Sequence, residues 1–357
     1  MTIRVAVWGS GGVGSRAIQA VAGRPDLALV GVWVHSPEKV GVDAGVLAGG
    51  TPIGVRATND ADALIAAKPD CVCYAASGPR GDAAAVPDYV RLLEAGINVV
   101  TVSTAALVYP PAYDAANLER LASAAERGGA SLYASGIEPG FAGDQLVLTL
   151  LTLSKTVRSV RVQEIFSYTD YPVAFVMREV FGFGKPLDHV PLLSRGGAQS
   201  ATWGAPVRMI AAAMGVQLDS IRETYEKAAT PRRLQVACGV IEAGSVGAVR
   251  FETIGVSGGR DAIVIEHVNR MAQGLAPDWP SARRDGTYRV VVEGEPSLQC
   301  ELTVGTPETF SAEGMLATAM RVVNAIPAVC AAPPGLVSSL DLPLTLPQHA
   351  FQTRSTA

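Results

Sequence analysis

The sequence predicts an α/β protein: an N-terminal Rossmann domain followed by an α+β domain with an open mixed or antiparallel sheet. Three observations support this prediction. Up to about residue 144, short apolar β-rich runs alternate with amphipathic helical stretches. A glycine-rich run directly follows the first of these strands. Beyond residue 145, runs with strand-like alternation come close together, as in an antiparallel sheet with one buried face.

The Rossmann domain is expected over residues 1–144. Its helices would cover both faces of a parallel sheet, because every strand is followed by a helical stretch after a short connection. The predicted strands are 4–8, 29–34, 71–75, 98–102 and 131–133, and the predicted helices are 13–22, 60–67, 84–95 and 112–127.

The second domain is expected over residues 145–310 and would bind substrate and form a dimer. It begins with a helix that ends near Leu153, and helical stretches are predicted at 173–181 and 207–214. Its predicted strands are 160–166, 248–256, 262–269, 288–293 and 298–304. The amphipathic helix at 313–325, within a C-terminal segment over 311–357, is expected to return to the first domain.

Composition limits the possible partners. The 357 residues carry a formal net charge of −4 without long runs of one sign, which argues against nucleic acid or an anionic membrane as a partner. No stretch of roughly 18 apolar residues lacks a charge, Gly or Pro, so a membrane span is not expected. The start MTIRVAVW enters a strand pattern directly, which favours a cytoplasmic protein.

Cysteine and histidine positions predict no metal site. Cys71 and Cys73 lie in one apolar strand pattern and are expected to be packed thiols, and the four histidines are scattered along the chain.

The loop after the first strand has the spacing of a dinucleotide-binding turn. It reads Gly9, Ser10, Gly11, Gly12, Val13, Gly14, a G-x-G-x-x-G run between a predicted strand and a predicted helix. Such a turn lets the backbone approach a pyrophosphate and places it at a helix N-terminus, where free N–H groups favour anions. A nicotinamide cofactor is therefore expected.

The end of the second predicted strand indicates which cofactor is preferred. An Asp or Glu at this point would bind the ribose 2′-OH of NAD, but the residues there are His35 and Ser36, followed by Glu38 and Lys39. Ser36 could donate to a 2′-phosphate, and His35 and Lys39 add positive or hydrogen-bonding character. NADP(H) is predicted, with NAD(H) possible; alternatively, His35 and Lys39 are plain surface residues.

Other residues are expected near the nicotinamide because ligands of open α/β sheets bind beyond the carboxyl ends of the strands. Small residues there would leave room for the cofactor, and Asn324 in the returning helix could bond the carboxamide. All of them have an ordinary loop or helix role as the alternative. They are Ala76, Ser77, Gly78, Ser103, Thr104 and Asn324.

Several stretches resemble the dihydrodipicolinate-reductase-like superfamily, in particular its actinobacterial branch with native amine dehydrogenases and 2,4-diaminopentanoate dehydrogenases. They are VAVWGSGGVG, VWVHSPEKVG, the crossing YASGIEPGF at 133–141, YTDYP, FGFGKP, EHVNRM and NAIPAV, spread over nearly the whole chain. The resemblance implies NAD(P)H-dependent reduction of a C=N bond, or reductive amination of a ketone with ammonia.

The chain departs from its relatives at two places. The His-His-x-x-Lys and PSGTA-like runs of dihydrodipicolinate reductases do not occur, which argues against that specific activity. The better-described amine dehydrogenases place a glutamate shortly after the fifth Rossmann strand, whereas residues 103–108 contain no acid.

Glu138 is the predicted catalytic carboxylate. It lies between Gly136 and Pro139 at the exit from the Rossmann domain, where it could hold ammonia and stabilise an iminium. Burial would raise its pKa toward the working pH. The alternative is that Glu138 caps the helix that follows, because acids stabilise helix N-termini.

Tyr168 is the second catalytic candidate, since its phenol could donate a proton or hydrogen bond to a carbonyl oxygen. Simple packing is the alternative for Tyr168 and for the other aromatic residues of this region. An apolar substrate pocket is predicted from Phe141, Tyr171, Phe175, Met177 and His267, where His267 could equally be a structural residue.

The sequence therefore predicts an NADP(H)-dependent oxidoreductase, most plausibly an amine dehydrogenase acting on small ketones or aldehydes with ammonia and working as a homodimer. Two alternatives remain: an ammonia-independent dehydrogenase or reductase of a specific metabolite, and a non-catalytic NADP-binding regulatory protein.

Overall fold

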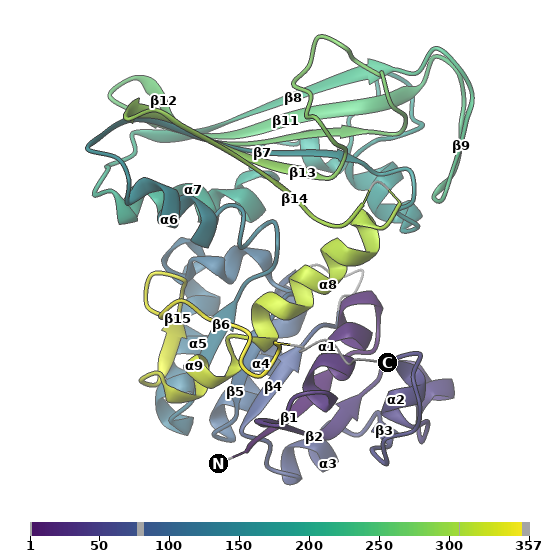
Figure 1. The fold of residues 1–357 in the computed structure, drawn as a ribbon, viewed down its shortest axis with the longest axis vertical. Helices are drawn as coiled ribbons and strands as arrows, with labels where there is room; N and C mark the ends of the chain where they lie inside the picture. Colours follow the sequence, from purple (N-terminus) through teal and green to yellow (C-terminus); the bar gives the residue numbers. More distant parts are fainter. Residues whose placement is uncertain (1, 77–81, 307, 352–357) are drawn as a thin grey trace. The chain divides into compact units, whose positions relative to one another are not determined.

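The computed structural model describes residues 2–76, 82–306 and 308–351. The chain folds into two compact units: residues 1–137 with 315–357 form unit 1, and residues 138–314 form unit 2. These limits lie a few residues from the boundaries predicted at 144 and 310, and at the second one the helix Phe310–Val323 is divided between the units. Figure 1 shows the elements of each unit.

Unit 1 contains a parallel sheet of seven strands in the order β15-β6-β5-β4-β1-β2-β3. This is the Rossmann-like sheet that the alternating pattern predicted. The strands are β1 (Ile3–Trp8), β2 (Leu27–Trp33), β3 (Ala57–Thr58), β4 (Cys71–Tyr74), β5 (Asn98–Thr101), β6 (Ser131–Ala134) and β15 (Gly335–Val337).

Helices cover both faces of this sheet. On one face, α1 (Gly12–Ala22), the later turns of α8 (Phe310–Val323) and α9 (Ile326–Ala331) pack on apolar residues of β1, β2 and β4. On the other face pack α3 (Ala61–Ala66), α4 (Val86–Glu94) and α5 (Ala115–Gly128). Helix α5 shows why these stretches begin and end where they do: Asp114 caps its first turn, and Gly129 ends it in the left-handed conformation.

Unit 2 contains a mixed sheet of six strands in the order β14-β13-β7-β12-β11-β8. The central pair β7 and β12 is parallel, and the other neighbouring pairs are antiparallel. The strands are β7 (Thr156–Ser167), β8 (Ser220–Ala229), β11 (Val246–Ser257), β12 (Arg260–Arg270), β13 (Thr287–Glu295) and β14 (Leu298–Thr303), and β9 (Leu234–Val236) pairs with β10 (Gly239–Ile241) in a separate ribbon.

One face of the six-stranded sheet packs on α6 (Gln145–Leu151) and α7 (Ser200–Ala213). Alternate residues of the central strands point toward these helices, such as Val160 and Val162 of β7 and Ile263 and Ile265 of β12. The residues between them point to the opposite face.

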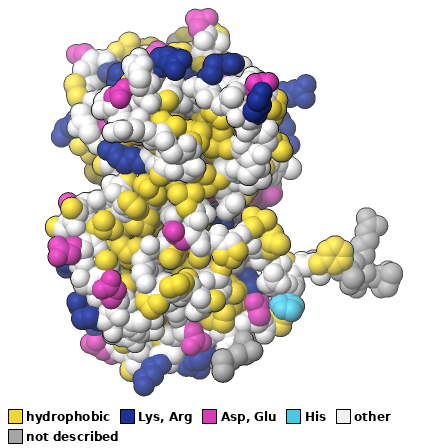
Figure 2. All heavy atoms as spheres, turned by 90° about the vertical axis from the view of Figure 1, so that its left-hand side faces the viewer, with side chains coloured by type: hydrophobic (Ala, Val, Ile, Leu, Met, Phe, Trp, Pro, Cys, Tyr) yellow, Lys and Arg dark blue, Asp and Glu magenta, His cyan; other side chains and the backbone are white. Residues whose placement is uncertain are grey.

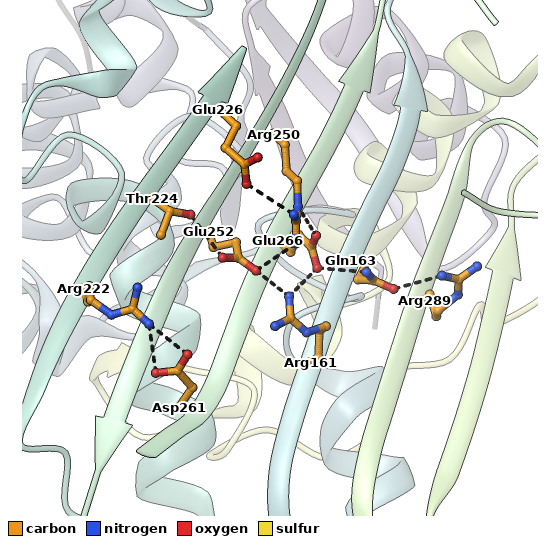
Figure 3. Close-up of polar contacts among 10 residues, drawn as sticks. All are labelled: Arg161, Gln163, Arg222, Thr224, Glu226, Arg250, Glu252, Asp261, Glu266 and Arg289. Atoms are coloured by element: carbon orange, nitrogen blue, oxygen red, sulfur yellow. Dashed lines mark hydrogen bonds and ion pairs between the residues drawn. The ribbon is translucent and has the colours of Figure 1, made fainter. Parts of the chain in front are cut away.

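The opposite face carries a charged network instead of an apolar layer (Figure 3). At its centre lies Glu266 of β12, which is fully buried and accepts from Arg161 Nη1, from Gln163 Nε2 at 2.9 Å and from Arg250 Nε at 2.7 Å. Glu252 bridges Arg161 and Arg250. Burial opposes ionisation of Glu266, but the two arginines and Gln163 outweigh it, and its pKa is lowered.

One helical stretch among the described residues, Phe310–Ala331, is long and apolar enough to cross a membrane by length and composition alone. It contains Glu313 and Arg321, and Val322, Val323 and Ile326 are completely buried in the core of unit 1. Of its most apolar window, 33% is buried, and the buried residues belong to the core of unit 1.

The strand prediction for unit 2 was incomplete. Strand β8 and the β9–β10 ribbon were not predicted, and the helical stretch predicted at 173–181 is a five-residue π-helix, Val176–Val180. Cys71 and Cys73 are buried free thiols, as predicted.

The network makes Glu266 a sensitive position. We expect Glu266→Gln to lower the free energy of unfolding by about 3 kcal/mol, because it removes the charge between two partly buried arginines. Glu226→Gln is the matched control: Glu226 meets Arg250 with its side chain 48% exposed, and its loss should cost less than about 1 kcal/mol. Urea unfolding at neutral pH measures both, and equal losses would contradict this account.

Candidate active site

The glycine loop of unit 1 has the backbone that a dinucleotide turn needs. Gly9 has a φ of +107°, and a Cβ there would lie 2.9 Å from the backbone N of Ala76. A Cβ on Gly14 would lie 2.0 Å from the carbonyl oxygen of Gly9. A Cβ on Gly11 would meet nothing within 4 Å. Gly9 and Gly14 are thus required for the turn itself, whereas the space beside Gly11 is open and could admit a ligand.

Helix α1 begins at this loop. Gly11 is its N-cap and supplies no side-chain cap, so the first N–H groups of an 11-residue helix are available to an anion. Ser10 and Val13 are half-buried, Gly12 is exposed, and the sulfur of Met315 packs closely over Gly12. No sequence signal pointed to Met315, because it lies some 300 residues away in α8.

The end of β2 brings one cation to the glycine loop. Lys39 Nζ lies 3.4 Å from Ser10 Oγ. His35 is exposed beside Trp33, with ring centroids 6.2 Å apart, and Ser36 is half-buried at the start of the short 3-10 helix η1 (Pro37–Lys39). Glu38 is exposed. The structure therefore brings Lys39 to the loop.

Two of the other expected cofactor residues are placed elsewhere. Thr104 is buried, and its hydroxyl hydrogen-bonds that of Tyr89 at 3.0 Å, so this side chain belongs to the core. Asn324 Oδ1 accepts from Arg24 Nη1 at 3.1 Å, beyond the end of α1 that is remote from the glycine loop. The predicted carboxamide contact of Asn324 is therefore wrong.

The remaining expectations concern strand ends. Ala76 lies against Gly9, and Ser103 is half-buried with its N–H bonded to Thr101 Oγ1. Ser77 and Gly78 lie outside the described residues.

Gly11 and Gly14 should respond differently to an added methyl group. We expect Gly11→Ala to fold normally but to bind NADPH at least about tenfold more weakly, because the methyl would face the phosphates. Gly14→Ala should also lower the melting temperature, since its methyl collides with backbone. Fluorescence titration and thermal unfolding test this; unchanged NADPH affinity in Gly11→Ala would contradict it.

Unit 2 holds a buried carboxyl without a partner, that of Glu138. Both of its oxygens are buried and have no hydrogen bond among the described residues. Gly143 makes room for it, since a Cβ there would lie 3.1 Å from Oε2. Burial, then Glu164 and Asp144, raise the pKa of Glu138 well above its usual value. The Trp203 indole opposes this slightly, although it lies outside hydrogen-bond geometry.

The capping alternative for Glu138 is wrong. The N-cap of α6 is Asp144, whose side chain accepts from the N–H of Gln145. Glu138 is therefore not needed to stabilise this helix, and its burial without a partner requires another explanation.

A second buried acid, Glu164 in β7, was missed by the sequence analysis. It is 5% exposed, and its Oε1 accepts from the Tyr168 hydroxyl at 2.6 Å and from Asn269 Nδ2 at 3.2 Å. Burial raises the pKa of Glu164 to about 7, against the opposing effect of these two donors. The signal was available: Val160, Val162, Glu164 and Phe166 alternate along β7, so one acid interrupts an apolar face.

Tyr168 is thus bonded to an acid within the same cluster. Burial, and then Glu164, raise the pKa of the Tyr168 phenol well above its usual value, so it stays a donor. Tyr171 packs edge-on against Tyr168 at 5.7 Å.

His267 is a buried neutral residue of this cluster. It stacks on Phe251 with ring centroids 4.5 Å apart and meets Trp203 at 4.7 Å. Burial lowers the pKa of His267 to about 3, and its Nδ1 has no partner among the described residues. His267 therefore brings no positive charge to the acids.

The structure gathers only some of the predicted pocket wall. Met177 is 1% exposed in the same apolar cluster as Phe251, and Tyr171 packs on that cluster. Phe175 is 55% exposed, and Phe141 is half-buried just before α6.

The site is rich in acceptors, and no counter-cation lies among its described residues. Its polar atoms without a partner among the described residues include Glu138 Oε1 and Oε2, Asn269 Oδ1 and His267 Nδ1. Within the described part of the chain, neither Glu138 nor Glu164 is hydrogen-bonded or ion-paired to a Lys or Arg. Buried anionic groups of this kind are complementary to a small cation with several N–H donors.

Comparison with known proteins gives consistent matches. The family model of the dihydrodipicolinate reductase N-terminus matches residues 3–105, and that of the 2,4-diaminopentanoate dehydrogenase C-terminal domain matches residues 141–353. An amine dehydrogenase of Streptomyces virginiae is 40% identical over 352 residues, which is 96% of each chain. A 2,4-diaminopentanoate dehydrogenase of Acetoanaerobium sticklandii is 26% identical, covering 71% of this chain and 68% of its own.

The fold also matches a solved structure. An amine dehydrogenase from Mycobacterium smegmatis superposes with a TM-score of 0.78 over 98% of both chains, at 23% identity. This similarity shows a common fold.

Proposed function

The chain belongs to the family of 2,4-diaminopentanoate dehydrogenases and amine dehydrogenases, and on this premise we propose that it is an NADP(H)-dependent amine dehydrogenase. Its substrates would be small ketones or aldehydes and ammonia, and its products primary amines. The observation that carries this proposal is the buried carboxyl of Glu138, which has neither a hydrogen-bond partner nor a counter-cation among the residues that the structure describes.

Reductive amination requires proton transfers at the substrate nitrogen and oxygen. Ammonium must lose a proton before it attacks the carbonyl carbon, and the hydroxyl of the resulting carbinolamine must gain a proton to leave as water. The iminium that remains is a cation. When bound, the reduced nicotinamide supplies the hydride that converts the iminium to the amine.

Glu138 suits both proton transfers. Its carboxylate would accept the ammonium proton and later return it to the leaving hydroxyl. The raised pKa of Glu138 makes its carboxylate a stronger base, so that its proton affinity is closer to that of ammonia. The anion that remains would stabilise the iminium. Tyr168, Tyr171 and His267 would line the apolar and aromatic side of the same site.

The direct test is NADPH oxidation at alkaline pH with a panel of ketones and aldehydes, including cyclohexanone, with and without ammonium. Ammonium-dependent oxidation that yields the amine is expected. Oxidation without ammonium would instead identify a carbonyl reductase, and no oxidation with any carbonyl would favour a narrow metabolite substrate or a non-catalytic binder.

Glu138→Gln should lower kcat/KM for ammonium at least about 100-fold, because the amide cannot exchange the proton. Asp170→Asn is the control, since Asp170 is an exposed acid in the same unit. Unchanged turnover in Glu138→Gln would remove Glu138 from the mechanism, and equal losses in both variants would point to a general effect of charge.

NADP(H) is the proposed cofactor. The N-terminus of α1 would hold the pyrophosphate, and Lys39, Ser36 and His35 would contact the 2′-phosphate. The support for NADP(H) over NAD(H) is the position of Lys39 beside Ser10 and the lack of an acid between Val34 and Ser36.

Substitution at this loop should separate the two cofactors. Lys39→Ala is expected to lower kcat/KM for NADPH about tenfold and to leave the value for NADH nearly unchanged, because only NADPH carries the 2′-phosphate. Glu38→Gln serves as the neighbouring control. A parallel loss with both cofactors would mean that Lys39 supports the loop rather than the 2′-phosphate.

We also propose a cytoplasmic homodimer. The five free cysteines suit a reducing compartment. The charged sheet face of unit 2 (Figure 3) lies opposite the face that packs on α6 and α7, and its mixed charges could pair with those of a second copy. In Figure 2, hydrophobic side chains gather on the visible surface of each unit, and those of unit 2 could also take part. A monomeric mass by light scattering would contradict the dimer.

A further inference from the structure

Glu164 has a position that the proposed role of Glu138 does not explain. It lies toward the C-terminal end of β7, level with His267 of the parallel strand β12, on the helix-covered face of the sheet. An acid among Val160, Val162, Ile263 and Ile265 costs stability unless its carboxyl is hydrogen-bonded or paired.

The two buried carboxyls differ in their donors. Glu164 receives a phenol O–H and an amide N–H on the same oxygen, and both contacts favour its ionised form. Glu138 receives no hydrogen bond from the described residues, which favours its protonated form. The two groups repel each other when both are ionised.

We propose that Glu164 is the positioning residue of the amine site: its carboxylate, which accepts from Tyr168 and Asn269, repels a second negative charge nearby and thereby holds on Glu138 the proton that the pair takes up from ammonium. This inference rests on the proposed function, because the proton in question is the one exchanged with ammonia and with the leaving hydroxyl.

With this arrangement, each proton transfer at the site has a donor and an acceptor. An ammonium ion gives one proton to the Glu138 carboxylate and becomes ammonia, which attacks the carbonyl carbon. The Glu138 carboxylic acid returns that proton to the carbinolamine hydroxyl, the C–O bond breaks, and water and an iminium are formed. The anionic Glu164 makes Glu138 a stronger base in the first step and remains ionised in the second.

The other titratable groups around the pair do not cancel this charge. Asp144 at the start of α6 is a further acid and acts on Glu138 in the same direction. Tyr168, Tyr171 and Tyr288 have raised pKa values and stay neutral, and His267 stays neutral because its pKa is lowered to about 3.

The test is the pH profile of kcat/KM for ammonium in the full-length enzyme. Glu164→Gln removes the charge but keeps an oxygen that can accept from Tyr168. We expect the acidic limb, which reports Glu138, to move to lower pH by about one unit, and kcat on the plateau to fall about tenfold. Glu164→Asp keeps the charge and should leave the limb near its wild-type position.

Glu226→Gln is the matched control, because Glu226 lies on β8 in the network of the opposite sheet face (Figure 3). It should leave the profile unchanged. An unmoved limb in Glu164→Gln, even with lower activity, would overturn the proposal and reduce Glu164 to a structural residue, while the amine dehydrogenase activity itself would stand.

A second measurement does not depend on turnover or on the proposed function. Infrared spectroscopy separates the C=O stretch of a protonated carboxyl from the carboxylate bands. Near neutral pH, the wild-type minus Glu138→Gln difference spectrum should contain a protonated carboxyl, and in Glu164→Gln this band should disappear at lower pH. The absence of the band in the wild type, or an unshifted titration in Glu164→Gln, would contradict the shared proton.

Discussion

Two carboxyls, those of Glu138 and Glu164, are buried without a counter-cation among the described residues, and the functional account depends on this constraint. Taking one carboxylate out of water costs several kcal/mol unless it is paired, hydrogen-bonded or protonated. Elsewhere in the same sheet the protein shows the usual solution, because Glu266 is surrounded by Arg161, Gln163 and Arg250. Glu138 has no such partners among the described residues. The Glu138 carboxyl is therefore free to exchange a proton with a ligand or to pair with a cationic one.

The unit 2 sheet contains both a carboxylate paired with arginines and a carboxyl without a cation among the described residues, because they lie on its two opposite faces. In β7, Arg161 and Gln163 point to the charged face, while Val162 and Glu164 point to the helix-covered face. A one-residue change of register would exchange these sets, so the apolar alternation also places the acid correctly. The tyrosine and asparagine that hold Glu164 come from the segment just after β7 and from the adjacent strand β12.

Sequence patterns predicted the parts of the fold where local physics dominates. The glycine positions, the family resemblance and the strands β1, β2, β4, β5 and β6 of unit 1 were predicted because close backbone approach and period-2 or period-3.6 patterns are visible locally. The short strands β3 and β15 at the two edges of this sheet were not predicted. Strand β8 was missed because ETYEKAA within it consists mostly of helix-favouring residues, and only pairing with β11 makes it a strand.

The candidate site was predicted only where neighbouring residues in the sequence indicate it. Glu138 was identified from its neighbours in sequence, and its capping alternative could be rejected only once Asp144 was seen at the start of α6. Glu164 was missed because the meaning of an acid in a strand depends on which face it occupies and on Asn269, 105 residues away. Asn324 was misassigned because its partner Arg24 lies 300 positions away in the chain.

The central claim is that this site selects an amine through the carboxyl of Glu138, which exchanges a proton with the amine nitrogen. The most direct measurement compares, by calorimetry in the presence of NADP⁺, the binding of a primary amine and of the alcohol with the same carbon skeleton. The account predicts that the amine binds at least about tenfold more tightly, and that Glu138→Gln removes this preference. Equal affinities for the amine and the alcohol in the wild-type protein would contradict it.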